Sequence, residues 1–174
     1  ANAYKYFGLT HGPRGTWVFR EFAPNATEIF LIGTFNNWRP SEAFRLTMTG
    51  KGVWELKLPK NALKDGDLYK MLVYWPGGSG ERIPAYAQRV VQDSATGIFS
   101  AQVYDPADPY RFKIDNFTPD TKPLLIYECH IGMAQEKEAV GSYDEFRIKI
   151  LPRIHKDGYN AIQIMAIQEH PYYA

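Results

Sequence analysis

The main candidate for chemistry in this sequence is Trp38, which closely follows a short apolar run. Residues 29–32 read Ile-Phe-Leu-Ile, a pattern typical of a strand that is covered on both faces. Gly33 ends the run, and Asn36 and Asn37 favour a turn, because asparagine tolerates left-handed backbone and hydrogen-bonds its own main chain. The sequence therefore predicts that Trp38 lies on a turn at the rim of a sheet. It is then either a plug that caps the core, the commoner role of a large aromatic, or a flat apolar face on which a sugar ring stacks.

Other chemically active residue types lack the spacing that a site needs. The four histidines have no metal-ligand spacing, and Cys129 and His130 are strand neighbours that point to opposite faces, so we predict no metal site. Glu128 and His130 follow one predicted strand, and Glu169 and His170 follow another, at the carboxyl ends where α/β barrels build active sites. We expect these groups to hold loops by hydrogen bonds rather than to react. The sequence offers no convincing nucleophile and no cofactor motif.

Composition limits the classes of function. The chain has 174 residues, 45% of them hydrophobic, which suffices for one domain plus a piece of another. Its net charge of +1 lacks the basic excess that nucleic acid or an anionic membrane attracts, so we predict neither as a partner. A single cysteine cannot form an internal disulfide, and no apolar run reads as a membrane span or signal peptide, so we expect a cytoplasmic protein. Aromatic residues make up 15%, which favours ring stacking.

The elements that would position Trp38 are short alternating strands separated by turn residues. The predicted strands cover residues 16–22, 29–32, 44–48, 53–58, 68–74, 89–92 and 99–104. In the run 53–58, apolar residues alternate with charged ones, which predicts a core position for Trp54. The glycine-rich residues 76–80 are predicted to form a hairpin loop. This spacing predicts a mainly β fold, with an immunoglobulin-like antiparallel β-sandwich over residues 1–104.

A different pattern begins after the predicted sandwich. Residues 105–123 carry repeated prolines and are predicted to be a linker between domains. Residues 124–129 are a continuous apolar run and are predicted to be a strand, and residues 161–166 are predicted to be a second one. A helix between them makes a right-handed crossover in a parallel sheet. Two strands cannot cover such a sheet, so residues 124–174 are expected to open a larger α/β domain.

The helix of this crossover has clear start and stop signals. Ser142 and Glu145 form a capping box, in which Ser accepts from the backbone and Glu reaches back, so the helix is predicted to begin at Tyr143. Its buried stripe is predicted to consist of Phe146, Ile150 and Ile154. Pro152 lacks an amide proton and is expected to kink the helix, and Gly158 is placed to end it.

Several motifs in this chain carry a resemblance to a known family. The second part resembles the first barrel segment of the glycogen and starch branching enzymes through residues 126–132 (Ile-Tyr-Glu-Cys-His-Ile-Gly), 151–154, 158–160 and 165–173 (Met-Ala-Ile-Gln-Glu-His-Pro-Tyr-Tyr). The first part resembles the glycogen-binding sandwich of those enzymes through residues 19–24 (Phe-Arg-Glu-Phe-Ala-Pro), 35–38 (Phe-Asn-Asn-Trp) and 52–56 (Gly-Val-Trp-Glu-Leu). The resemblance implies that residues 124–174 are the truncated β-α-β start of a TIM barrel.

The resemblance also implies a set of binding residues. It places contacts with an α-1,4-glucan such as glycogen, starch or a maltooligosaccharide at Phe22, Pro24, Trp38, Gly50, Lys51, Gly52 and Lys70. A stacked ring and a lysine that hydrogen-bonds hydroxyl groups suit a neutral polyol. Relatives have Trp where this chain has Phe22, which leaves a smaller stacking face here.

The activity that the resemblance implies is transglycosylation, in which an α-1,4-glucan is cut and the released chain is rejoined through an α-1,6 link. It follows the retaining route, in which one carboxylate attacks the sugar and another acts first as acid and then as base. In relatives these carboxylates lie on later barrel strands, so we expect no catalytic residue before Ala174, and neither a cofactor nor a metal. Tyr172 and Tyr173 are expected to be structural rather than a sugar platform.

Two other classes of function remain open from the sequence. A stand-alone glycogen-targeting module of the kinase-β-subunit type shares Phe-Asn-Asn-Trp, but it would not need residues 124–174. A sandwich used only for protein contacts would bury Trp38 at an interface. We also expect the unpaired edges of the strands predicted at 124–129 and 161–166 to favour self-association.

Overall fold

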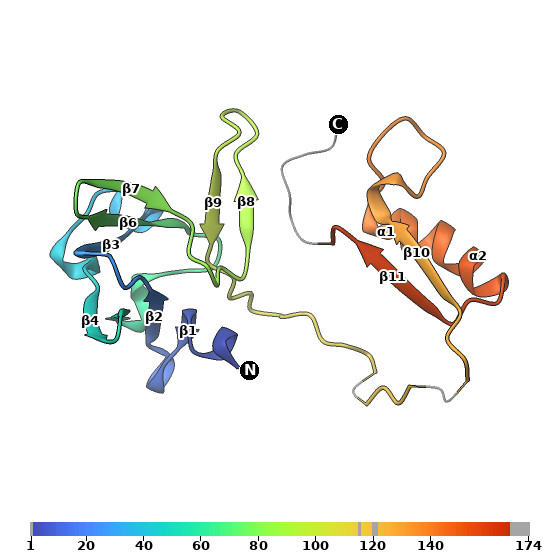
Figure 1. Cartoon of the computed structure of the whole chain (residues 1–174), viewed down its shortest axis with the longest axis horizontal. Coiled ribbons are helices and arrows are strands. Elements are labelled where there is room, and N and C mark those ends of the chain that lie inside the picture. Colours follow the sequence, from blue (N-terminus) through green and yellow to red (C-terminus); the bar gives the residue numbers. More distant parts are fainter. Residues whose placement is uncertain (1, 115, 120–121, 168–174) are drawn as a thin grey trace. The chain divides into compact units, whose positions relative to one another are not determined.

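The computed structural model describes residues 2–114, 116–119 and 122–167 (Figure 1). The chain divides into two compact units, Ala1–Arg111 and Phe112–Ala174, and the division falls inside the segment 105–123 that is predicted to be a linker. Each unit has a hydrophobic core of its own. No helix among the described residues is both long and apolar enough to cross a membrane.

The first unit consists of two antiparallel sheets. The β2–β5 sheet has the order β1 (Gly8–His11), β2 (Trp17–Phe22), β5 (Val53–Leu58) and β4 (Thr47–Gly50). The β3–β6 sheet has the order β3 (Glu28–Gly33), β6 (Leu68–Trp75), β9 (Phe99–Gln102) and β8 (Val90–Gln92), and β7 (Gly78–Arg82) pairs with β6. A short 3-10 turn at Ala3–Lys5 precedes β1, and further ones at Pro13–Gly15, Thr34–Asn36, Glu42–Phe44 and Lys60–Ala62 lie between the strands. The predicted mainly β sandwich is confirmed.

The core of the first unit is rich in aromatic side chains from both sheets. Trp54 is buried, and its indole Nε1 donates to the Ala23 carbonyl at 3.0 Å, which confirms the predicted core position. Phe19 and Tyr69 meet edge to face with 6.3 Å between ring centroids. Burial raises the pKa of Tyr69, and the charge of Glu21 raises it further, so the phenol stays neutral.

Strand β3 is buried on both faces, as residues 29–32 predict, although it lies at the end of its sheet. Ile29 and Leu31 are fully buried in the core, and Phe30 and Ile32 are buried on the opposite face. The free edge of β3 is covered by the chain that follows it, because the Leu46 amide donates to the Ile29 carbonyl at 2.9 Å. A covered edge removes the penalty that an exposed apolar edge strand would carry.

The structure corrects several predicted elements. Residues 44–46 are not in a strand, because Glu42–Phe44 forms a 3-10 turn and β4 begins only at Thr47. The glycine-rich stretch 76–80 is not a loop throughout, because Trp75 pairs with Gly78 and only two residues form the turn. Strands β1 and β7 were not predicted, since glycines weaken the alternation by which a strand is recognised.

The second unit is a parallel β-α-β unit. Strand β10 (Ile126–His130) pairs in parallel with β11 (Ala161–Met165), and a 3-10 turn at Ile131–Met133 follows β10. The predicted strand 124–129 therefore begins two residues later than expected, because Leu125 instead exchanges hydrogen bonds with Asn160. Phe146, Ile154, Cys129 and Ile131 form its small core, against which Ile150 packs, and this confirms the predicted helical stripe.

The connecting helix begins and ends where the sequence predicts. It comprises α1 (Tyr143–Glu145), a π-helical stretch Phe146–Ile150 and α2 (Leu151–Lys156). Pro152 lies in the first turn of α2, directly after the π-helical stretch, where a missing amide proton is best tolerated. Gly158 has φ +94° and ends the helix, since a left-handed residue at this place satisfies the last carbonyls.

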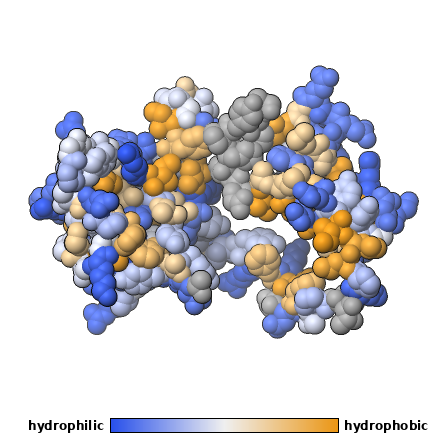
Figure 2. All heavy atoms as spheres, viewed as in Figure 1, coloured by the Kyte–Doolittle hydropathy of each residue, from blue (hydrophilic) through white to orange (hydrophobic). Residues whose placement is uncertain are grey.

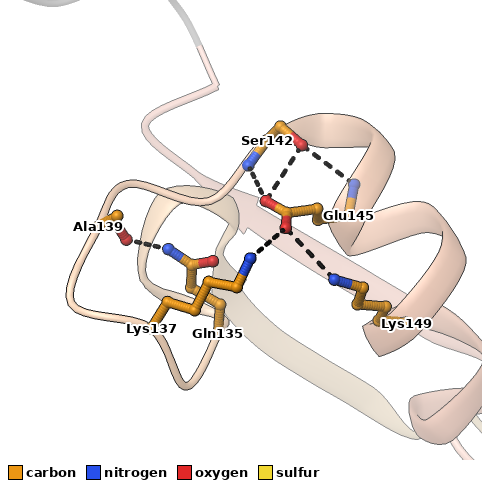
Figure 3. A network of polar contacts seen from close by, with 6 residues as sticks. All are labelled: Gln135, Lys137, Ala139, Ser142, Glu145 and Lys149. Carbon is orange, nitrogen blue, oxygen red and sulfur yellow. Dashed lines mark hydrogen bonds and ion pairs between the residues drawn. The ribbon is translucent and has the colours of Figure 1, made fainter.

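Glu145 is the centre of a polar network at the helix start (Figure 3). The Glu145 amide donates to Ser142 Oγ at 3.2 Å, and the Ser142 amide donates to Glu145 Oε2 at 3.3 Å, which confirms the capping box. Lys149 and Lys137 place their Nζ atoms 3.3 and 3.7 Å from Glu145 Oε1. The Ser142 backbone hydrogen bond, with smaller effects from both lysines, lowers the pKa of Glu145.

Because the pKa of Glu145 is lowered, the stabilisation of the helix start by its carboxylate should depend on pH. A carboxyl group whose pKa is lower in the folded state contributes stability above its ordinary pKa of about 4.3 and loses it as the pH falls through the folded value. We expect Glu145→Gln to speed amide hydrogen exchange in residues 143–147 at neutral pH and to match the wild type in acid. Glu138→Gln, at an exposed loop position, is the control. A difference that persists in acid would contradict the role of the charge.

Candidate functional site

The turn after β3 is held by the side chain of Asn36. The Gly33 amide donates to Asn36 Oδ1 at 2.8 Å, and Asn36 Nδ2 donates to the Leu31 carbonyl at 3.0 Å. The Trp38 amide closes the turn by donating to the Gly33 carbonyl at 2.9 Å. The turn is thus fastened to a buried strand, and Thr34 Oγ1 also donates to Asp67 Oδ1 at 2.9 Å. Asn36 is a positioning residue, because it fixes where the chain leaves β3.

Trp38 has a strained backbone and an exposed ring. Asn37 and Trp38 have φ values of 54° and 58°, and the left-handed region is a true outlier for a residue as large as tryptophan. Strain of this kind costs roughly 1–3 kcal/mol. The Trp38 side chain remains 37% exposed, so its ring does not plug the core. Deep burial therefore does not offset the strain.

Lys70 and Glu81 complete the surroundings of the Trp38 ring. Lys70 Nζ lies 5.9 Å from the ring centroid of Trp38, within range of a cation–π interaction. The same Nζ donates to Glu81 Oε2 at 2.9 Å, and the Lys70 side chain is only 14% exposed. Lys70 lies on β6 and Glu81 on β7, so neighbouring strands hold the pair in place. An apolar ring, an ammonium donor and a carboxylate acceptor of balanced charge suit a neutral polyol.

The other predicted residues form a second group on the β2–β5 sheet. Gly52 packs so closely on Pro24 and Phe22 that an added Cβ would lie 2.7 Å from Pro24 and 3.2 Å from the Phe22 ring. Gly50, Lys51 and Gly52 make the β4–β5 turn with φ values of 133°, 51° and 80°. The Gly52 carbonyl accepts from the Ala23 amide at 2.8 Å. Phe22 and Pro24 are exposed beside this turn.

The two groups lie at opposite ends of β3. Residues 23–27 lead from Phe22 directly into β3 at Glu28, whereas Trp38 follows the far end at Gly33. Five residue steps separate these ends, which is about 17 Å along a strand. The structure therefore brings Trp38 together with Lys70 and brings Phe22 and Pro24 together with Gly50–Gly52. The seven glucan contacts predicted from the sequence therefore form two groups, and Glu81 is not among them.

One of the predicted strand-end groups, His130, lines a small hollow in the second unit. The hollow has about 40 Å³ of free volume at the ends of β10 and β11, and His130, Gly132, Tyr143 and Met165 are among its lining residues. Tyr143 donates its hydroxyl to the Ile167 carbonyl at 3.0 Å and so ties the helix start to the strand end. Burial, with the negative charge of Glu128, raises the pKa of Cys129. Glu169, His170, Tyr172 and Tyr173 lie outside the described residues.

A larger hollow of the second unit offers no stacking surface. It has about 150 Å³ of free volume beside the Glu145 network, and its lining contains no aromatic ring. Its charged groups already pair with one another, for instance Arg153 Nη1 with Glu136 Oε1 at 3.8 Å. Among the described residues, no three His, Cys, Asp or Glu side chains are placed to hold a metal ion.

Asn36 provides a test of how the turn positions Trp38. Asn36→Ala removes both side-chain hydrogen bonds and is expected to lower the free energy of unfolding by about 1–3 kcal/mol, measured by chemical denaturation. Asn36→Asp keeps an acceptor for the Gly33 amide and loses only the donor to Leu31, so its loss should be smaller. Equal losses in the two variants would contradict the double hydrogen bond.

Comparison with known proteins places this geometry in a family. Residues 6–87 match the family of carbohydrate-binding module 48 (isoamylase N-terminal domain). The chain is 40% identical over 180 residues to 1,4-alpha-glucan-branching enzyme 2-2 of Arabidopsis thaliana, a match that covers 100% of this chain and 22% of the relative. It is 39% identical to the 1,4-alpha-glucan-branching enzyme of Aspergillus oryzae, again over 100% of this chain and 26% of the relative.

Solved structures with the same fold come from pullulanases. The pullulanase of Paenibacillus barengoltzii in complex with maltohexaose and α-cyclodextrin has a TM-score of 0.69 at 19% identity, covering 94% of this chain and 27% of that one. The Group B Streptococcus pullulanase in complex with maltotetraose has a TM-score of 0.68 at 20% identity, covering 95% and 24%. The chain spans about a quarter of the length of these relatives. Residues 6–87 thus match the family of carbohydrate-binding module 48, and the whole chain is similar to about a quarter of the length of 1,4-alpha-glucan-branching enzymes.

Proposed function

We propose that the first unit binds an α-1,4-glucan, such as glycogen, starch or a maltooligosaccharide, with the ring of Trp38 and the side chain of Lys70 in contact with the sugar. One observation carries this proposal. Trp38 combines a strained left-handed backbone with an exposed ring, and strain that burial does not offset is typical of a functional position. The predicted contacts at Phe22, Pro24 and Gly50–Gly52 belong to the same proposal as a separate group.

The chemistry around Trp38 supports a neutral sugar. A pyranose presents an apolar face that packs on an indole ring, and its hydroxyl groups both donate and accept hydrogen bonds. Lys70 supplies a donor and Glu81 an acceptor, and their mutual ion pair leaves no net charge for an ionic ligand. Each contact contributes about 1 kcal/mol, so we expect high-micromolar to millimolar dissociation constants.

We also propose that this chain is part of a branching enzyme, which cuts an α-1,4-glucan and forms an α-1,6 link. Its catalytic carboxylates are expected on barrel strands that follow β10 and β11, which we infer to be the first two strands of a TIM barrel. The kinase-type targeting module is not favoured, because the similarity to branching enzymes extends over the whole chain, including residues 124–174. A sandwich used only for protein contacts would not bind glycogen, so retention on glycogen beads separates it from the other two classes.

Substitution of Trp38 tests binding and strain together. Trp38→Ala is expected to abolish retention on glycogen beads and to leave the circular dichroism spectrum unchanged. Trp38→Gly should also lose binding. Its free energy of unfolding should nevertheless be about 1 kcal/mol higher than that of the alanine variant, because glycine adopts a left-handed backbone without strain. Lys64→Ala, at an exposed lysine near the start of β6, is the control and should bind normally. Unfolding of Trp38→Ala would identify Trp38 as a core plug and contradict the proposal.

Self-association of the 174-residue chain is a further part of the proposal. Within the described residues, β10 and β11 pair only with each other, and apolar residues are exposed along them: Leu124, Leu125, Ile126, Ile162 and Met165. Figure 2 shows hydrophobic side chains open to solvent on this unit. Unpaired edges and bare apolar area both favour a partner, which a second copy would supply.

Light scattering after size exclusion tests this association. The wild type is expected to be dimeric at high concentration, and Ile126→Lys should shift it toward monomer, because a charged residue disfavours edge pairing. Ile98→Lys changes an equally exposed isoleucine of the sandwich and should leave the dimer intact. A wild type that stays monomeric throughout the concentration series would refute the association.

A further inference from the structure

The outer face of the β2–β5 sheet carries a side-chain cluster of which the proposed function uses only Phe22. Along β2, Trp17, Phe19 and Glu21 are directed into the sandwich, so Val18, Arg20 and Phe22 are directed to its outer face. Arg20 lies opposite Glu55 of β5 in the sheet register. This face is therefore distinct from the β3–β6 sheet, where Trp38 and Lys70 meet.

Arg20 is the centre of the cluster. Its Nε donates to Glu55 Oε2 at 2.7 Å, and its guanidinium carbon lies 4.5 Å from the ring centroid of Tyr6. Arg20 also donates through Nη1 to the Tyr6 carbonyl at 3.4 Å, so both ends of its planar group have fixed partners. Phe22 is the next outward residue of β2, and two steps along a strand place its Cα about 7 Å from that of Arg20.

The polar residues at the centre of the cluster are largely buried, whereas its aromatic rings are exposed to solvent. The side chains of Arg20 and Glu55 are only 20% and 17% exposed, whereas Tyr6 is 47% and Phe22 55% exposed. Held donors and acceptors lose little entropy when a ligand binds them. Exposed aromatic rings beside such a pair supply the apolar area that a sugar ring needs.

The charged groups of the cluster are paired with one another and still offer hydrogen bonds to a ligand. Burial raises the pKa of Glu55, but hydrogen bonds and charges from Lys57 and Arg20 outweigh this effect and lower its pKa overall, so Glu55 remains ionised at neutral pH. Glu55 pairs with Arg20 through Oε2 at 2.7 Å and with Lys57 through Oε1 at 3.1 Å, so the two cations share one carboxylate. The paired groups retain both donors and acceptors, and a polyol uses both.

We propose that Tyr6, Arg20 and Glu55, with Phe22 at the margin, form a second α-glucan-binding surface on the sheet opposite Trp38. The inference takes its ligand class from the proposed function, but its residues are separate from Trp38 and Lys70. It gives Phe22 a place at this second surface rather than at the Trp38 ring. Two surfaces on one module would let it contact two glucan chains or two stretches of one chain.

Amide chemical-shift mapping of the 174-residue chain with maltoheptaose tests the proposal. We expect two sets of saturable shifts, one around Trp38, Lys70 and Glu81, and one around Arg20 and Glu55. Trp38→Ala should remove the first set and keep the second, which we expect to be the weaker site and too weak by itself to retain the chain on glycogen beads. Tyr6→Ala should raise the dissociation constant obtained from the second set of shifts by roughly five- to tenfold, because one stacked ring is lost. The first set should be unchanged. Tyr4→Ala is the control, since this exposed tyrosine contacts Lys5 rather than Arg20.

The outcomes separate this inference from the proposed function. If the wild type shows shifts around Arg20 and Glu55 but none around Trp38, the Trp38 site is refuted and the second surface is supported. Absent shifts at Arg20 and Glu55, or shifts there that disappear in Trp38→Ala, overturn the second surface. An unchanged dissociation constant in Tyr6→Ala overturns it as well. Shifts at Arg20 that depend on protein concentration without sugar would assign the face to a second copy of the chain, which also overturns it.

Discussion

The burial of β3 on both faces is the constraint on which the first unit depends. Each of its apolar side chains contributes about 1.5–3 kcal/mol when fully buried, so the register of this strand is strongly fixed. Its end is fixed as tightly, because a Cβ on Gly33 would lie 2.2 Å from the Leu68 carbonyl oxygen. The chain must therefore turn at this point, and Asn36 supplies the hydrogen bonds that close the turn. The position of Trp38 follows from packing beneath it.

Stability and binding are separated within this module. The aromatic core between the sheets does not include Trp38 or Tyr6, whose rings are exposed. The backbone strain at Trp38 is tolerated because the buried strand and the Thr34–Asp67 hydrogen bond of 2.9 Å hold the turn from both sides. In the second unit the core is much smaller, and many apolar residues of β10 and β11 face solvent.

The fold was largely predictable because its strongest signals are local. Alternation in β2, β5 and β6, the continuous apolar run of β3 and the Ser142–Glu145 capping box each report the environment of consecutive residues. The errors came where local signals are weak. Glycines conceal the alternation of β1 and β7, and residues 44–46 alternate like a strand but instead close over the edge of β3. Tertiary packing overrides propensity at such positions.

The sequence by itself determined that Trp38 follows a buried strand on an asparagine turn, and that one chain joins a sandwich to a parallel β-α-β unit. Only the tertiary structure decided which distant residues meet. Glu81 reaches Lys70 through the register of the β6–β7 hairpin, and Tyr6 reaches Arg20 through the pairing of β1 with β2. Register depends on turn length and on which face is buried, so it is not encoded in the spacing of the contacting residues. For the same reason the seven predicted contacts divide between two sheets, since the 23–27 crossover places Phe22 and Trp38 at opposite ends of β3.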